Sequence, residues 1–386
     1  MGRESESASA LAVSDADFLV IGGGVAGLSA AARLARHKRV VVLEAEEALG
    51  YHASGRSATF SHFGIGNRIV RALTAHSRGF FLAGEGELAR RSTALFVATD
   101  DMATALETLA RDMSAFTGSV RPADAAEMLR LFPPLRTGGD AITAGLVYPD
   151  GLRLDSDAML QLFARQVREA GGSVLMGKRA ERVTATGGGW RVEAGGEAWT
   201  APVLVNAAGA WADGVAAMAG VAPLGLTPLR RTIIVVDPPE GADVRDWPFV
   251  KTVVDDFYVL PESGRLMASP VDEVESDPCD AQPEEYDVAL AAWKVERYTT
   301  LSVARIAHRW AGLRTFTRDR TPAVGFDPDA PGFFWLAGQG GFGLQTAPAV
   351  AEAVEALATG GVWPEALGAL GVTAESIAPR RTVLHE

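Results

Sequence analysis

Short apolar runs that end at glycine-rich turns are the clearest pattern along the chain. Residues 18–21 are a continuous apolar segment typical of a buried parallel strand, and residues 39–43, an arginine followed by four apolar residues, are a second strand-like run. Residues 28–34 follow the first strand with the small side chains of a closely packed helix. Residues 203–205 and 333–337 repeat the strand pattern, and each is followed by glycine. The pattern predicts an α/β fold with a parallel sheet.

Other segments indicate a second structural unit. Residues 231–236 and 257–260 are strand candidates. Residues 155–170 place apolar side chains on one face of an amphipathic helix that packs on a core. Because the chain has 386 residues, and a domain usually has about 100–200, we expect two domains.

The turn after the first strand fits the G-x-G-x-x-G pattern at Gly22, Gly24 and Gly27. In this motif the glycines allow a tight turn, close approach of a pyrophosphate to the backbone, and close packing of helix on strand. A lone motif is also compatible with an ordinary glycine turn. Here, however, Glu44 ends the second strand about 20 residues further on, where a carboxylate binds a ribose 2′-hydroxyl. The sequence therefore predicts an adenine dinucleotide. Strand-to-glycine junctions spread over the whole chain favour FAD over a nicotinamide cofactor, because FAD lies across several strand ends.

Composition and charge exclude several classes of protein. The net charge of −12 argues against a nucleic-acid surface, and we see no apolar run near the ~20 residues of a membrane span. Residues 1–15 lack the basic start and long apolar stretch of a secretory signal, so we expect a disordered extension and a cytoplasmic protein. The single cysteine, Cys279, offers neither an internal disulfide nor a metal cluster, and we expect no metal.

Six longer segments are more specific than the dinucleotide motif: GYHASGRSA (50–58), VLVNAAGAWAD (203–213), PLGLTPLRR (223–231), FYVLPESG (257–264), HRWAGLRTF (308–316) and AGQGGFGLQT (337–346). On these segments the chain resembles the FAD-dependent amine oxidoreductases of the D-amino acid oxidase and glycine oxidase superfamily, from about residue 17 to about residue 381. It is most similar to the D-arginine dehydrogenases.

This resemblance implies a discontinuous architecture. A Rossmann-like FAD-binding domain of the glutathione-reductase type would gather residues 16–92, 145–228 and 303–375. An α+β substrate-binding domain with a mixed β-sheet would be built from residues 93–144 and 229–302.

The resemblance also implies the residues that contact FAD, including a helix N-terminus at 340–346 that would lie near the flavin pyrimidine. The implied positions are Gly22, Gly24, Val25, Ala26, Gly27, Glu44, Ala45, Ser54, Arg56, Ser57, Ala58, Thr59, Ala180, Ala208, Gly209, Trp211, Gly340, Gly341, Phe342, Gly343, Leu344, Gln345 and Thr346. Since Cys279 lies outside the region where related enzymes attach flavin to cysteine, we expect FAD to be held non-covalently.

The protein must bind a group of the substrate that fixes its orientation. For an amino acid this group is the carboxylate, which pairs best with a planar guanidinium. The resemblance assigns this role to Arg231, Arg314 and Tyr258, with the neighbouring Arg230 as an alternative to Arg231.

The side-chain pocket departs from the D-arginine dehydrogenases. Phe60 and Ile65 stand where those enzymes have histidine and tyrosine, and the region of Thr93 lacks their glutamate, so D-arginine is a doubtful substrate. Phe60, Ile65 and Phe249 favour an apolar or neutral side chain, whereas Lys251 would favour an acidic one. The predicted pocket residues are Phe60, His62, Ile65, Thr93, Phe249, Lys251, Gly341 and Phe342.

The resulting hypothesis is hydride transfer from Cα of a D-amino acid to flavin N5, giving an imino acid that water hydrolyses to a 2-oxo acid. Glycine- or sarcosine-oxidase-like oxidation of an N-substituted amino acid is the first alternative. A flavoprotein with a biosynthetic role that does not involve free D-amino acids is the second. The electron acceptor, oxygen or a quinone, and the oligomeric state stay open.

Overall fold

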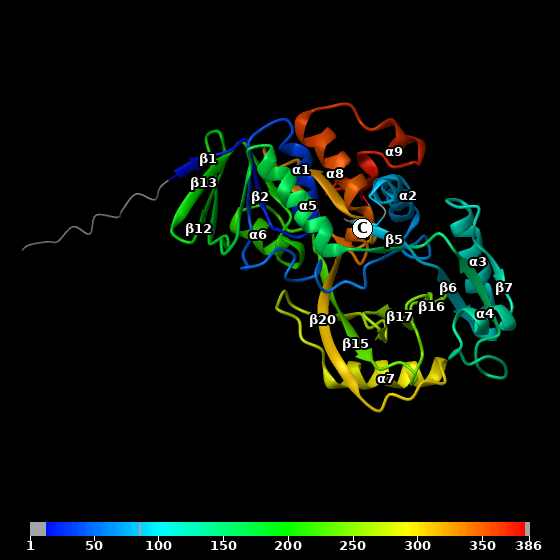
Figure 1. Cartoon of the computed structure of the whole chain (residues 1–386). Helices are drawn as coiled ribbons and strands as arrows, with labels where there is room; N and C mark the ends of the chain where they lie inside the picture. The colour runs from blue at the N-terminus through cyan, green and yellow to red at the C-terminus, as the bar shows by residue number, and fades with distance from the viewer. Residues whose placement is uncertain (1–12, 85, 383–386) are drawn as a thin grey trace, which may run out of the picture.

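The computed structural model describes residues 13–84 and 86–382, and a six-stranded sheet organises one part of these residues (Figure 1). The strand order is β10-β3-β2-β14-β22-β21, with every neighbouring pair parallel except β21 with β22. The apolar runs therefore form the predicted parallel strands. The bounds are β2 (Phe18–Ile21), β3 (Val40–Leu43), β10 (Ser173–Leu175), β14 (Val203–Asn206), β21 (Ala323–Phe326) and β22 (Phe333–Ala337).

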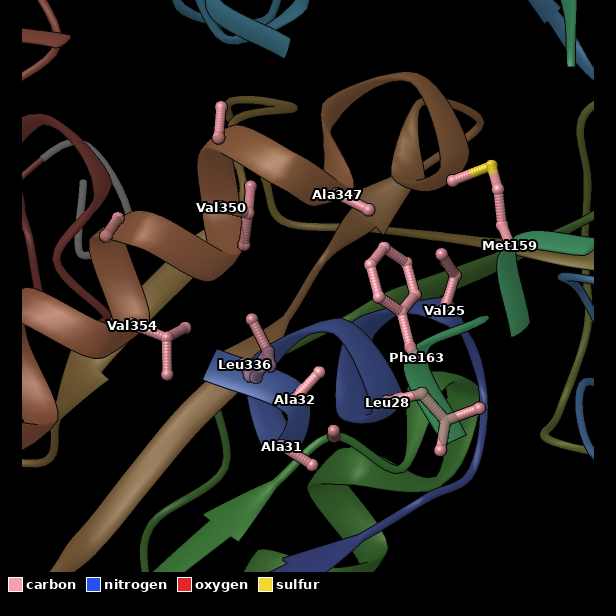
Figure 2. Close-up of a cluster of buried hydrophobic side chains, with 14 of the residues drawn as sticks. Val25, Leu28, Ala31, Ala32, Met159, Phe163, Leu336, Ala347, Val350 and Val354 are labelled. Atoms are coloured by element: carbon pink, nitrogen blue, oxygen red, sulfur yellow. The ribbon is translucent and has the colours of Figure 1, made fainter. Parts of the chain in front are cut away.

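Three helices cover one face of this sheet. They are α1 (Val25–Leu34), α5 (Ser156–Glu169) and α8 (Gly343–Thr359). Figure 2 shows side chains from these helices and from β22 meeting in one apolar cluster. Alanines on the buried face of α1, such as Ala31, let α8 pack closely. The predicted amphipathic helix is α5, whose N-terminus is capped by the side chain of Asp155.

The opposite face is covered by a four-stranded sheet with the order β1-β13-β12-β11, together with α6 (Ala212–Met218). The strands are β1 (Val13–Asp15), β11 (Arg182–Thr186), β12 (Gly189–Ala194) and β13 (Glu197–Ala201). The predicted disordered extension, residues 1–15, is wrong for Val13–Asp15, because these residues pair in parallel with β13 at the sheet edge. Residues 1–12 lie outside the described residues.

A ten-stranded mixed sheet organises the rest of the described chain, in the order β23-β20-β15-β18-β17-β16-β6-β8-β7, with β19 also paired to β15. Helix α7 (Glu285–Tyr298) packs on one face, beneath β15 and β20 in Figure 1. The strands are β6 (Ala94–Ala98), β7 (Arg121–Ala123), β8 (Ala144–Tyr148), β15 (Thr227–Val236), β16 (Phe249–Thr252), β17 (Tyr258–Glu262), β18 (Arg265–Ser269), β19 (Val274–Glu275), β20 (Ile306–Phe316) and β23 (Gln339–Gly340).

Smaller elements complete the fold. They are β4 (Phe60–Ser61), β5 (Ala89–Arg91), β9 (Leu152–Leu154), α2 (Arg68–Ala83), α3 (Ala103–Ser114), α4 (Ala125–Leu131), α9 (Glu365–Ala369) and three 3₁₀ turns, η1 (Asp100–Met102), η2 (Gly209–Trp211) and η3 (Glu375–Ile377).

The predicted domain boundaries stay a prediction. Strands β8 and β20 were assigned by sequence to the FAD-binding part, yet both pair within the ten-stranded sheet. Strand pairing forms between segments far apart in the chain, so local patterns do not fix such a boundary.

Candidate functional site

A cavity of about 400 Å³ lies where the carboxyl ends of the parallel strands face the ten-stranded sheet. Ile21 of β2, Leu43 of β3 and Ala337 of β22 line it at the strand ends. Arg231, Tyr258 and Arg314 line it from the ten-stranded sheet. Ligands of open α/β sheets bind at the carboxyl ends of strands, so both sheets contribute to one candidate site.

The three glycines of the G-x-G-x-x-G turn are not all required for the same structural reason. A Cβ on Gly22, whose φ is +113°, would lie 2.3 Å from the carbonyl oxygen of Ala207, and one on Gly27 would lie 1.9 Å from the carbonyl oxygen of Gly22. These two glycines are required by packing within the protein. A Cβ on Gly24 would contact only Ser54 Oγ, at 3.3 Å, so the backbone of Gly24 is open to the cavity that it lines.

Polar groups hold this turn in place. The Glu44 carboxylate accepts hydrogen bonds from the Gly23 N–H at 2.6 Å and from the Glu46 N–H at 2.8 Å. Ser54 Oγ accepts from the Val25 N–H at 3.0 Å, at the first residue of α1. Glu44 therefore lies fixed at the end of β3, beside the glycine turn.

Most predicted site residues line this single cavity: Gly22, Gly24, Val25, Ala26, Glu44, Ala45, Ser54, Arg56, Ser57, Ala58, Thr59, Phe60, His62, Ile65, Ala180, Ala208, Gly209, Trp211, Arg231, Phe249, Lys251, Tyr258, Arg314, Gly340, Gly341, Gly343 and Leu344. Five predicted residues, all in the described part of the chain, lie outside its wall: Gly27, Thr93, Phe342, Gln345 and Thr346. Gln345 and Thr346 are buried inside α8, and the Thr93 carbonyl accepts from the Phe249 N–H at 2.9 Å. Of these five, Thr93 and Gln345 make hydrogen bonds to residues of the wall, Phe249 and His62.

Strand alternation distinguishes the two adjacent arginines of β15. Arg230 faces α7, where its guanidinium contacts the Asp287 carboxylate at 2.8 Å. Arg231 points to the other face and lines the cavity with Arg314 of β20. Of the two arginines that the sequence left open, Arg231 is the one in the cavity.

A carboxylate that the sequence reasoning missed lies between these arginines. Glu273 Oε1 accepts from Arg314 Nη1 at 3.3 Å and from Arg231 Nη2 at 3.5 Å, and Arg320 also binds Glu273. Burial opposes ionisation of Glu273, but the hydrogen bond from Arg320 and the charge of Arg314 bring its pKa below the usual value. No local motif signals this contact, because Glu273 follows β18 and the three arginines come from other segments.

Arg314 is largely buried, with its side chain 15% exposed. Burial, followed by the neighbouring Arg231 cation, lowers the pKa of Arg314 to about 9, so Arg314 stays charged at neutral pH. Gly341 lies directly against the guanidinium: a Cβ there would be 2.0 Å from Arg314 Nη2. The hydroxyl of Tyr258 has no hydrogen-bond partner among the described residues, and Tyr258 lines the same cavity. The arrangement offers several donors to one small anion.

Lys251 and His62 form a second polar group in the wall. Lys251 is 3% exposed and its Nζ lies 2.8 Å from Asp255 Oδ1. Burial lowers the pKa of Lys251, with Asp255 opposing this effect. Burial, followed by the charge of Lys251, lowers the pKa of His62 to about 3, so His62 is neutral at physiological pH. The His62 ring packs against both Phe60 and Phe249, with centroid distances of 5.9 Å and 5.2 Å.

Arg56 and Cys279 have surroundings that the sequence did not predict. Arg56 lines the cavity, but its guanidinium also donates to the carbonyl oxygens of Ala281 and Ala311, at 3.0 and 3.1 Å, and so ties its loop to the ten-stranded sheet. Cys279 is exposed and lines the cavity as well. Non-covalent binding of FAD stays a prediction.

A model of the family described as "FAD dependent oxidoreductase" (DAO) matches residues 17–357. The chain belongs to this family. This FAD-dependent oxidoreductase is 24% identical over 359 residues to glycine oxidase from Geobacillus kaustophilus (strain HTA426), a match that covers 86% of this chain and 90% of that protein. It spans only about a third of the FAD-dependent oxidoreductase domain-containing protein 1 of Xenopus laevis, with 29% identity over 41% of this chain and 35% of that protein.

Solved structures share the fold of this oxidoreductase. L-proline dehydrogenase from P. horikoshii has a TM-score of 0.82 at 21% identity, over 96% of this chain and 99% of its own. Glycine oxidase from Geobacillus kaustophilus has a TM-score of 0.81 at 19% identity, over 95% of this chain and 99% of its own. These structures confirm the fold class expected from the sequence, including the mixed sheet, and the family match over residues 17–357 confirms the expected superfamily.

The cavity of this FAD-dependent oxidoreductase fits its cofactor. The open backbone at Gly24 and the fixed carboxylate of Glu44 are what a pyrophosphate and a ribose require at the end of a parallel strand. No helix in residues 13–84 and 86–382 combines the length and hydropathy needed to cross a bilayer.

Proposed function

We propose that this oxidoreductase oxidises the CH–NH bond of an amino acid, in the manner of a D-amino acid dehydrogenase or oxidase. The observation that carries the proposal is the convergence of Arg231, Arg314 and Tyr258 on one cavity wall that faces the FAD-binding strand ends. Two guanidinium groups and a phenol match the acceptor atoms of a carboxylate. The predicted domain organisation, with a substrate-binding part opposite an FAD-binding part, is consistent with this arrangement and remains part of the proposal.

The role of the protein in this reaction is placement. FAD supplies the two-electron acceptor for the hydride that leaves Cα. Arg231 and Arg314 hold the carboxylate and so fix the direction of the Cα–H bond, which makes the transfer effectively intramolecular. The substrate loses one hydride from carbon and one proton from nitrogen, and the imino acid that results reacts with water to give a 2-oxo acid and ammonia.

The proton on the substrate nitrogen leaves to solvent in this proposal. His62 is a poor general base, because a group with a pKa of about 3 is far less basic than an amine. The neutral amine therefore arises by deprotonation in solution before or during binding.

Anaerobic mixing with amino acids tests the reaction class. We expect D-amino acids to bleach the flavin absorbance at roughly 450 nm, and L-enantiomers to leave it unchanged, because the cofactor itself carries the redox change. Bleaching by N-methyl amino acids in place of D-amino acids would instead support the alternative function, which the similarity to glycine oxidase favours. The absence of bleaching by any amino acid would support a role without amine oxidation. Recovery of the colour with oxygen, or only with a quinone, identifies the acceptor.

The Arg314→Ala variant tests the carboxylate clamp, the proposed binding of the substrate carboxylate by Arg231 and Arg314. We expect FAD content and its spectrum to be retained while KM rises about 100-fold or more, the cost of removing one partner of a buried charge pair. Arg320→Ala is the matched control, because Arg320 binds the same Glu273 but does not line the cavity. Equal KM values for wild type and Arg314→Ala would remove Arg314 from the site.

A further inference from the structure

The substrate side chain would meet a wall that is partly aromatic and partly polar. Phe60 and Phe249 stack with their ring centroids 4.6 Å apart, and Lys251 follows Phe249 two residues later on β16. Lys251 pairs with Tyr258 in the antiparallel register of β16 and β17. Paired residues point to the same face of a sheet, so Lys251 and Tyr258 face the same cavity.

The hydrogen bonds of Lys251 are incomplete. An ammonium group has three donors. Lys251 Nζ contacts Asp255 Oδ1 at 2.8 Å and donates to the Thr252 carbonyl oxygen at 3.1 Å. In the described part of the chain no third acceptor contacts it. One donor of a buried cation therefore remains for a ligand in the cavity that Lys251 lines.

Lys294, a buried lysine in the same region, has all three of its donors hydrogen-bonded within the protein. Its ammonium donates to the carbonyl oxygen of Asp256 at 2.7 Å, to Asp256 Oδ1 at 2.7 Å and to the Pro270 carbonyl oxygen at 2.8 Å. Asp255 and Asp256 lie in one turn, and each pairs with a buried lysine. Only the lysine on the cavity side has a donor left.

His62 adds a second donor to this wall. Nδ1 accepts a hydrogen bond from the Gly64 N–H at 3.0 Å, so the proton of the neutral ring is on Nε2. Nε2 has no acceptor among the described residues, and the ring lines the cavity. The Nε2–H of His62 and the unused donor of Lys251 give this end of the cavity two donors for acceptor groups, next to the Asp255 carboxylate that also lines it.

Building on the function proposed above, we propose that the substrate is a dicarboxylic amino acid, and that Lys251 and His62 bind its second carboxylate. Arg231 on β15 and Lys251 on β16 are separated by the two strands β18 and β17. The spacing of strands gives about 14 Å between their backbones, and both long side chains line the same cavity. The sequence favoured an apolar or neutral side chain; the unused donors of Lys251 and His62 favour the acidic alternative.

Pairs of substrates that differ in charge but little in shape test this inference on the wild-type holoenzyme. D-glutamate is compared with D-glutamine and D-aspartate with D-asparagine, by the anaerobic rate of flavin bleaching and by kcat/KM. We expect the acid of each pair to be preferred about 10- to 100-fold, the range for a charge-assisted hydrogen bond. Iminodiacetate against N-methylglycine makes the same comparison for an N-substituted substrate.

The outcomes separate the two proposals. Reduction by the amides or by apolar D-amino acids as fast as by the acids would overturn the dicarboxylate inference and leave amine oxidation standing. No reduction by any of these compounds would overturn the proposed function and the inference with it.

Two matched variants assign the preference to Lys251. In Lys251→Met we expect the ratio of kcat/KM for acid over amide to fall to about 1, whereas Lys294→Met keeps the wild-type ratio. A preference that survives in Lys251→Met would overturn the role of Lys251. If Lys251→Met fails to retain FAD, the wild-type ratio alone still decides the substrate class.

Discussion

At the residue scale, position on a strand decides which of several similar side chains reaches the site. Arg230 and Arg231 are adjacent in the sequence, yet Arg230 binds Asp287 of α7 and Arg231 lines the cavity. The same rule places Lys251 in the cavity, whereas Val250 lies in the core on the α7 side of the sheet. Chemistry at this site therefore depends on alternation along strands rather than on residue type.

His62 gives a prediction for pH dependence. Its pKa is about 3 in the folded chain against 6.5 for an ordinary histidine, so between these values the unfolded chain binds more protons. Stability should therefore rise with pH over this window. We expect the unfolding free energy to be lower at pH 5 than at pH 7 by about 2 kcal/mol from His62 alone. Denaturant unfolding at both pH values measures it. In His62→Phe the difference should shrink by that amount, and an unchanged difference would refute the assignment.

At the element scale, the turn between β23 and α8 sets the position of Arg314 on β20. This turn contributes Gly340, Gly341 and Gly343 to the cavity wall, and the β23–β20 pairing joins Gly340 to Thr315. The backbone at Gly341 leaves no room for a side chain beside the guanidinium. A glycine in this turn is thus as important for the carboxylate clamp as the arginine itself.

Gly341→Ala tests this contact between elements. The added Cβ would lie 2.0 Å from Arg314 Nη2, so the guanidinium must move. We expect FAD to be retained and KM to rise by about 10-fold or more, approaching the effect of Arg314→Ala. Gly79→Ala in α2 is the control, because a Cβ there meets no atom within 4 Å. Alanine at position 79 should leave KM unchanged and stabilise the helix by about 0.5–1 kcal/mol. A wild-type KM in Gly341→Ala would show that substrate binding does not depend on the position of the Arg314 guanidinium beside Gly341.

At the scale of the whole molecule, one cavity joins two sheets that have separate cores. The six-stranded sheet contributes strand ends with the glycine turn, and the ten-stranded sheet contributes the charged wall. A ligand in this cavity contacts both, so its binding should couple their stability.

Removal of FAD tests this coupling and the mode of attachment. We expect acid or guanidinium treatment to release the yellow cofactor into solution, because non-covalent contacts are lost on unfolding. The FAD-free chain should have a lower Tm than the holoenzyme. Added FAD, at a free concentration of about 100 times its Kd, should raise the free energy of unfolding by about 2.7 kcal/mol. Colour that stays with the precipitated chain would contradict non-covalent binding. Cys279→Ser would then identify whether the exposed cysteine of the cavity wall is the attachment point.

The sequence by itself determined the parallel sheet, the G-x-G-x-x-G turn, the FAD cofactor and most of the cavity residues. The sheet and the turn depend on local periodicity and on glycines whose backbone geometry has few alternatives, whereas most of the cavity residues were implied by the resemblance to the D-amino acid oxidase and glycine oxidase superfamily. Only the tertiary structure decided that Val13–Asp15 pairs at a sheet edge, that Glu273 joins Arg231 and Arg314, and that Lys251 is buried with a donor unused. The reason is physical: such contacts join side chains from strands far apart in the chain, and their burial and partners exist only once the sheets have formed.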